Sequence, residues 1–180
     1  GYFEMPIKKG ESIIFSGSTS QIKSSSLKKL FDAEVEDRKP RDNFYHCLVC
    51  AAHQFHFRDR RSGTMEKIDK KDERYLLAGY PWFKVRARDT FISLPGLTLA
   101  VDEEDYFRAT MKTAAKALYD FMSTGACSVS IYEIEQPDIM LWCIWAIQQY
   151  SKKVGKEQTY KEYGKLVVDM ITYISKNKHI

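Results

Sequence analysis

The sequence predicts a mainly α-helical fold, and two observations carry this prediction. Apolar residues recur at helical spacing in six successive segments of the 180-residue chain. These segments are joined mainly by short links that contain Gly or Pro. Short links favour antiparallel helical hairpins, and one or two short strands are expected before and between the first helices. No repeat of fixed residue period accompanies the helices, so the sequence does not support a solenoid of exact repeats.

The chain opens with a segment that does not read as helical. Residues 11–16 are expected to form one short strand, and the Ser-rich, polar stretch at 17–26 is typical of a linker. Residues 1–25 are therefore interpreted as a remnant strand and a linker, and residues 26–180 as the main helical domain.

Two helices are expected next. Ser26 is placed to cap a helix over 26–37, which Pro40 ends. Asp42 or Asn43 is placed to cap a second helix that continues to about residue 54.

Extended chain is expected on both sides of a charged tract. Residues 55–59 and 75–78 are interpreted as extended. The tract at 58–71 mixes both signs of charge around Gly63, which is typical of a hairpin tip or an exposed loop.

Four further helices are expected over 89–99, 103–123, 138–153 and 159–176. Asp89 is placed to cap the first of them, and Pro95–Gly96 inside it predicts a kink or an early end. Gly125 and Gly155 are placed to end the second and third. The helix at 103–123 has the clearest apolar face: Phe107, Met111, Ala114, Ala115, Leu118 and Met122.

Composition and charge narrow the class of protein. The chain has 28 Lys and Arg against 24 Asp and Glu, a net charge of +4, with both signs interspersed. This mild excess does not indicate nucleic acid binding. No apolar run of about 18 residues is present, so no transmembrane helix is expected. The cysteines have no disulfide-type spacing, so reduced thiols in the cytoplasm are the default interpretation: Cys47, Cys50, Cys127 and Cys143.

Four side chains in the second helix have the chemistry of zinc ligands, namely His46, Cys47, Cys50 and His53. On a helix, Cys47 points away from the face that the other three share. Four ligands within eight helical residues cannot surround one tetrahedral ion well. A buried helix is the preferred interpretation, and no metal site is predicted.

The most informative stretch is the loop that opens the third helix, at 78–97. Tyr80 and Trp82 offer flat apolar faces with polar edges, and Arg88 and Asp89 follow at the start of an apolar helix. An Arg–Asp pair offers fixed donors and acceptors together, which suits a ligand rich in hydroxyl groups, such as a sugar. A helix cap with a salt bridge is the plainer interpretation of the same pair.

This stretch resembles the signature of glycogen debranching enzymes, in their amylo-α-1,6-glucosidase domain. The matching residues are Ala78, Gly79, Tyr80, Pro81, Trp82, Phe83, Arg88, Asp89, Thr90, Phe91, Ile92, Leu94, Pro95, Gly96 and Leu97. A Trp-Gly pair of the family is replaced here by Arg86-Ala87.

A second segment resembles the same family at the start of the fifth helix. The matching residues are Asp138, Leu141, Trp142, Ile144, Trp145 and Ala146. Trp142 and Trp145 share a helix face, so both are interpreted as core, or one of them as lining a sugar pocket. By resemblance, the residues that bind substrate are Tyr80, Trp82, Arg88, Asp89 and Asp138.

The resemblance implies a fold and a reaction. The family's domain is an (α/α)6 toroid, of which residues 26–180 would form the first half, with residues 1–25 left from a preceding β domain. The family hydrolyses the α-1,6-linked glucose stub of glycogen or another branched α-glucan, in the cytoplasm and without a cofactor. Its catalytic acid and base lie in later motifs, so we expect them downstream of Ile180 and expect the 180-residue chain alone to be inactive. Neither nucleic acid nor a membrane is implied as a partner.

Two alternatives to this function stay open at this point. The chain could belong to another glycosidase on the same toroid, active on an α-glucan or on trehalose. It could instead be a non-catalytic carbohydrate-binding or helical scaffold module. A half-toroid would also expose an apolar face, through which a homodimer is expected.

Overall fold

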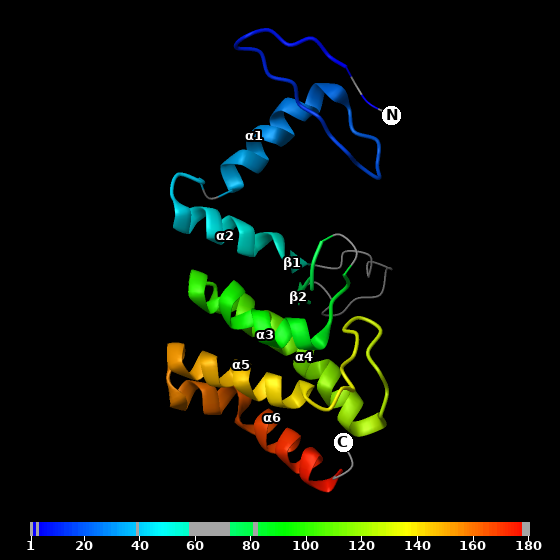
Figure 1. The fold of residues 1–180 in the computed structure, drawn as a ribbon, viewed down its shortest axis with the longest axis vertical. Coiled ribbons are helices and arrows are strands. Elements are labelled where there is room, and N and C mark those ends of the chain that lie inside the picture. The colour runs from blue at the N-terminus through cyan, green and yellow to red at the C-terminus, as the bar shows by residue number, and fades with distance from the viewer. Residues whose placement is uncertain (1, 3, 39, 58–72, 81–82, 178–180) are drawn as a thin grey trace. The chain divides into compact units, whose positions relative to one another are not determined.

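A computed structural model of the chain describes residues 2, 4–38, 40–57, 73–80 and 83–177. These residues divide into two compact units, 1–50 and 51–180, and each is described by itself. The described part is mainly helical, with six α-helices and one two-stranded antiparallel sheet, as the sequence predicts. Figure 1 shows the elements.

The first unit carries α1 (Leu27–Asp37), preceded by a 3-10 turn η1 (Ser24–Ser26). The strand expected at 11–16 is absent: these residues adopt no regular structure. A single strand needs a partner for its backbone groups, and no neighbouring segment of this unit pairs with it. Ser26 occupies the N-cap position of α1 as predicted, but its hydroxyl donates to the Lys23 carbonyl and makes no capping bond to the helix.

The apolar residues of α1 are poorly covered in the structure. Leu30, Phe31 and Val35 are each about half-exposed, at 51%, 49% and 54%. The predicted helix is therefore confirmed, but its apolar stripe has no covering partner among the described residues.

Helix α2 (Phe44–Gln54) begins directly after Asn43, whose side-chain oxygen accepts a 2.8 Å hydrogen bond from the His46 amide. This confirms a cap at the predicted place. A short antiparallel pair follows, β1 (His56–Phe57) with β2 (Tyr75–Leu76). The extended segments expected around the charged tract are thus present, whereas the hairpin tip predicted at 58–71 lies outside the described residues.

Helix α3 (Ala87–Leu97) starts two residues earlier than predicted. Asp89 is therefore part of the first turn and does not cap the helix. Pro95 lies inside α3, which continues only to Leu97, so the predicted early end is confirmed. A 3-10 turn, η3 (Leu99–Val101), leads to α4.

The last three helices are α4 (Glu104–Thr124), α5 (Ile139–Val154) and α6 (Lys156–Lys176). Gly125 ends α4 in the left-handed region, with φ of 70°, and its amide donates to the Phe121 carbonyl. Helix α6 begins immediately after Gly155, three residues earlier than expected, because one glycine both ends α5 and precedes α6.

Figure 1 shows α3, α4, α5 and α6 running in alternating directions, which is the expected hairpin arrangement. In the second unit, α3 packs mainly against α5, and α5 against α6. Phe107, Met111, Ala114 and Leu118 of α4 are fully buried in the shared core, as their spacing predicts. Among the helices that the structure describes, none has the length and apolar character needed to cross a bilayer.

Candidate functional site

A backbone connection sets the start of α3 beside the loop that precedes α5. The Ala87 amide donates to the Tyr132 carbonyl at 3.0 Å, and the Tyr132 amide donates to the Val85 carbonyl at 2.9 Å. Arg86 and Tyr132 form the corresponding parallel bridge. The first turn of α3 therefore lies against the start of α5, although about fifty residues separate them in sequence.

Arg88 and Asp138 meet across this connection in a two-pronged ion pair. Arg88 Nε donates to Asp138 Oδ2 at 2.7 Å, and Arg88 Nη2 donates to Asp138 Oδ1 at 2.8 Å. The two side chains are 44% and 37% exposed, so the pair is open to a ligand from solvent. Arg pairs with a carboxylate in this way with strong geometric preference.

Trp142 holds the carboxylate from one helical turn further on. Its indole Nε1 donates to Asp138 Oδ2 at 3.1 Å. Trp142 also meets Trp145 edge to face, with ring centroids 5.7 Å apart. Asp138 consequently has its orientation fixed by both Arg88 and Trp142.

The charge state of the pair follows from these contacts. The hydrogen bond from Arg88 is the main cause that lowers the pKa of Asp138 from 3.8 to about 2. The same bond raises the pKa of Arg88. At neutral pH Asp138 is a carboxylate and Arg88 a cation, so the site presents opposite charges side by side.

Asp89 is exposed in the first turn of α3, next to Arg88 in sequence. Its carboxylate has no hydrogen bond or ion pair with the residues that the structure describes. The sequence suggested that Arg88 and Asp89 act as a pair, whereas the structure pairs Arg88 with Asp138. Asp89 therefore keeps its acceptor oxygens available beside a fixed Arg–Asp pair.

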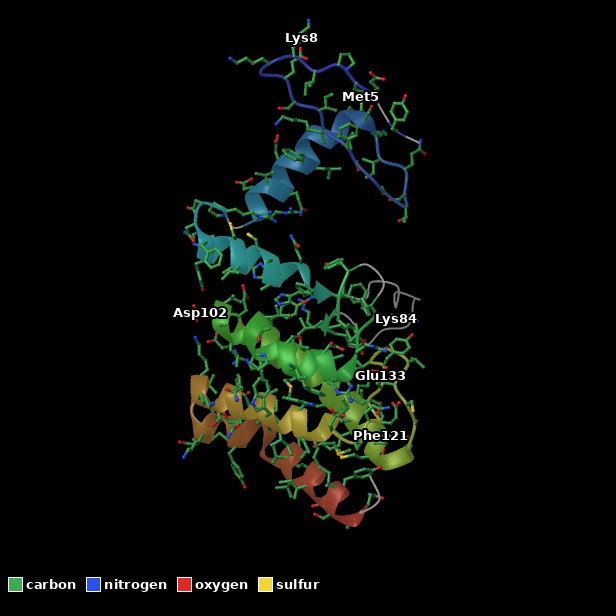
Figure 2. The ribbon with its side chains drawn as sticks, in the orientation of Figure 1. Met5, Lys8, Lys84, Asp102, Phe121 and Glu133 are labelled. Carbon is green, nitrogen blue, oxygen red and sulfur yellow. The ribbon has the colours of Figure 1, made fainter. Side chains whose placement is uncertain are left out.

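Arg86 and Glu133 form a second ion pair at the same helix start. Arg86 Nη2 donates to Glu133 Oε1 at 2.6 Å. Glu133 has φ of 62°, the left-handed region that side chains other than glycine rarely occupy. In Figure 2, Lys84 and Glu133 mark one end of α3 and Asp102 the other. Arg86 therefore forms an ion pair at the position where the family that this stretch resembles has a Trp.

The pairing of Arg86 with Glu133 is the feature that sequence reasoning missed. Glu133 lies in neither of the two segments that resemble the family. The sequence signal for this ion pair is Arg86 at a position where the family has Trp. The residues around Arg86 do not indicate which acid it pairs with.

Tyr80, another of the predicted binding residues, makes its contacts with the end of α2 and the residue that follows it, and not with this group. The Tyr80 hydroxyl donates to the Gln54 carbonyl, and its ring meets Phe55 edge to face at 5.7 Å. Tyr80 is nevertheless 56% exposed, so a ligand can reach it from solvent. Trp82 lies outside the described residues.

A cavity and a metal-binding cluster are two other features that can indicate a functional site. A cavity of about 440 Å³ beside α4 is lined by Glu73, Lys116, Asp120 and the loop at 126–131, and by none of the predicted site residues. Within the described ranges, no three His, Cys, Asp or Glu side chains are placed to share a metal ion. His46 contacts Asp42, and His53 contacts Glu103 at 3.1 Å.

Comparison with known proteins gives one match. A family model described as amylo-alpha-1,6-glucosidase matches residues 35–179. No curated protein and no solved structure matches the chain.

Proposed function

Because the chain belongs to the amylo-alpha-1,6-glucosidase family, we propose that Arg88, Asp89 and Asp138 bind the terminal α-1,6-linked glucose of a branched α-glucan. Glycogen is the branched glucan that the family's activity implies. In this reading the residues form part of the substrate site of a glycogen debranching enzyme. The antiparallel hairpins of α3 to α6 support a portion of the α/α toroid expected for the family.

The observation that carries the proposal is the exposed carboxylate of Asp89, which has no hydrogen bond or ion pair with the described residues and lies next in sequence to the fixed Arg88–Asp138 pair. A guanidinium has five N–H groups, and Asp138 takes two of them. The remaining N–H groups can donate to sugar hydroxyl oxygens, while Asp89 can accept from sugar hydroxyl groups. Because Trp142 and Arg88 hold Asp138 in place, little side-chain freedom is lost when the sugar binds.

The same contacts argue that Asp138 and Glu133 do not transfer protons in catalysis. A glycosidase needs a carboxylic acid that protonates the leaving oxygen and a second carboxylate on the other side of the bond. Asp138, with a pKa of about 2, stays ionised at neutral pH and is a poor proton donor. Glu133 is engaged by Arg86. We infer that this chain binds the sugar and that the catalytic acid and base are not among its residues.

We propose Tyr80 and Trp82 as further contacts of the glucan, through the faces of their aromatic rings. The exposure of Tyr80 to solvent supports this role. Its hydroxyl is already committed to the Gln54 carbonyl, so its contribution is the face of the ring.

Calorimetric titration of the 180-residue chain tests the proposal. The ligand is a maltooligosaccharide with one α-1,6-linked glucose, and linear maltotetraose and trehalose serve as comparison ligands. Arg88→Lys and Asp89→Asn should each weaken binding about tenfold or more, because each removes hydrogen bonds to a charged group. Asp169→Asn is the control, since it neutralises a half-buried acid that pairs with Lys165 on α6, away from the proposed site.

The outcomes separate the candidate functions. Preference for the branched ligand, lost in both site variants and kept in the control, supports the debranching site. Preference for a linear glucan or for trehalose would favour another glycosidase of the same architecture. Equal binding by all variants would overturn the assignment of these residues. Glucose release by the chain alone would contradict the inference that the acid and base lie elsewhere.

Self-association is a further part of the proposal. Tyr160, Val168 and Ile171 of α6 are exposed at 76%, 58% and 51%, so this helix presents apolar side chains to solvent. A homodimer would cover them. Sedimentation velocity should show a concentration-dependent dimer that Val168→Asp weakens and Lys161→Gln does not; a monomer at all concentrations would refute it.

A further inference from the structure

A second cavity, of about 280 Å³, lies beside the first half of α4 and is dominated by positive charge. It is lined by Arg74, Asp105, Arg108, Ala109 and Lys112. Three cations thus face one open space together with a single acid. None of these residues belongs to the proposed glucan site.

Arg108 is held in this cavity by a hydrogen-bond network through the buried Tyr150. Its Nη1 donates to the Tyr150 hydroxyl at 2.9 Å, and that hydroxyl donates to Glu162 Oε2 at 2.9 Å. Tyr150 is fully buried and stacks on Phe107, with ring centroids 4.7 Å apart. Arg108 therefore has a fixed position, which long surface side chains normally lack.

Arg74 is positioned from the other side by the chain that enters β2. Its backbone amide donates to Thr113 Oγ1 at 3.2 Å. Its guanidinium lies over the ring of Tyr106, 5.4 Å from the centroid, and Tyr106 stacks on His56 at 3.7 Å. Stacking of this kind leaves the N–H edge of the guanidinium available for an anion.

Lys112 and Asp105 are the other two charged residues that line the cavity. Lys112 follows Arg108 by one helical turn, is exposed, and has no ion pair with the described residues. Asp105 contacts Arg108 Nη2 at 2.5 Å, but its side chain is 95% exposed, so water screens its charge. The cavity keeps an excess of positive charge and two oriented guanidinium groups.

We propose that this cavity binds a phosphate group, carried either by free inorganic phosphate or by a phosphorylated sugar. Two guanidinium groups from different elements can each donate paired N–H groups to phosphate oxygens, and Lys112 adds a mobile third cation. A neutral glucan has no need of three cations in one place. The phosphate site is therefore independent of the proposed glucan site, and a negative result for one does not affect the other.

The test is a nuclear magnetic resonance titration of the ¹⁵N-labelled chain with inorganic phosphate at constant ionic strength. Saturable shifts of the Arg74, Ala109 and Lys112 amides are expected. Glucose 6-phosphate and glucose are titrated in parallel. Equal affinity for phosphate and glucose 6-phosphate assigns the site to the phosphate group itself, and tighter binding of glucose 6-phosphate assigns it to a phosphorylated sugar. Equal shifts with glucose, or linear shifts without saturation, would overturn the proposal.

Variants of residues that line the cavity provide a second test of the proposal. Arg74→Gln and Lys112→Gln should each weaken phosphate binding by about tenfold, the effect of losing one charged hydrogen bond. Lys116→Gln is the matched control, because Lys116 lies one turn further along α4 and lines the other cavity. Unchanged circular dichroism confirms folding of each variant. Equal weakening by Lys116→Gln would reduce the effect to net charge and refute a defined site.

Discussion

Arg88 and Asp138 are fifty positions apart in sequence, yet two hydrogen bonds of 2.7 and 2.8 Å join their side chains. The contact exists because the backbone bridge between Arg86 and Tyr132 brings the start of α3 to the start of α5. The contact brings two separate sequence motifs together in one charged site.

Trp142→Phe should weaken binding of the branched glucan without unfolding the protein. The substitution removes the indole N–H that orients Asp138 and keeps most of the apolar volume. A loss of severalfold is expected, corresponding to about 1 kcal/mol for one hydrogen bond. Calorimetric titration measures it. Trp145→Phe is the control, since Trp145 is more exposed and makes no hydrogen bond to Asp138; equal losses in the two variants would show that Trp142 acts through packing alone.

His56 should make the protein less stable as the pH falls from about 6.5 to about 4. Burial is the main cause that lowers the pKa of His56 to about 4, with a smaller effect of nearby His53, while the bond to the Leu97 carbonyl opposes it. The unfolded chain takes up a proton near pH 6.5 that the folded chain resists, so the His56 contribution is complete above that pH and is lost as the pH approaches 4.

Urea unfolding at a series of pH values measures this dependence. The His56→Gln variant should lose much of the slope between pH 6.5 and 4, because its side chain does not titrate. His46→Gln is the control, as His46 lies outside the second unit and contacts Asp42. The explanation is wrong if His56→Gln retains the full slope of the wild type.

Tyr150→Phe should destabilise the protein by about 1 kcal/mol or more, whereas Tyr163→Phe should be nearly neutral. Both rings belong to the same aromatic cluster with Phe107. The Tyr150 hydroxyl accepts from Arg108 and donates to Glu162, while the Tyr163 hydroxyl has no hydrogen bond with the described residues. Chemical denaturation compares the two variants, and equal effects would mean that the hydroxyl network contributes nothing to stability.

Gly164→Ala tests a close contact within α6. A methyl group at this position would lie 2.8 Å from Cδ2 of the Tyr160 ring. Alanine normally stabilises a helix interior by about 1 kcal/mol relative to glycine. We expect little gain in the wild type, because the Tyr160 ring must move, and the full gain in a Tyr160→Ala background. A double-mutant cycle measures the coupling, and strict additivity would contradict the contact.

The six helices, the end of α4 at Gly125 and the buried face of α4 could all be predicted from the sequence. Each depends on interactions between residues three or four positions apart, and such spacing is visible in the chain itself. The antiparallel order of the later helices could also be predicted, because links of a few residues leave little other choice.

The partners of the charged residues could not be predicted. Arg88 pairs with Asp138 and not with adjacent Asp89, and Arg86 pairs with Glu133. The strand expected at 11–16 fails for a related reason, since a strand is stabilised by a partner that lies elsewhere in the chain. What the sequence determined by itself was the set of helices and the residue types available for a site. Only the tertiary structure decided which side chains meet, because long-range pairing depends on how the helices pack against each other.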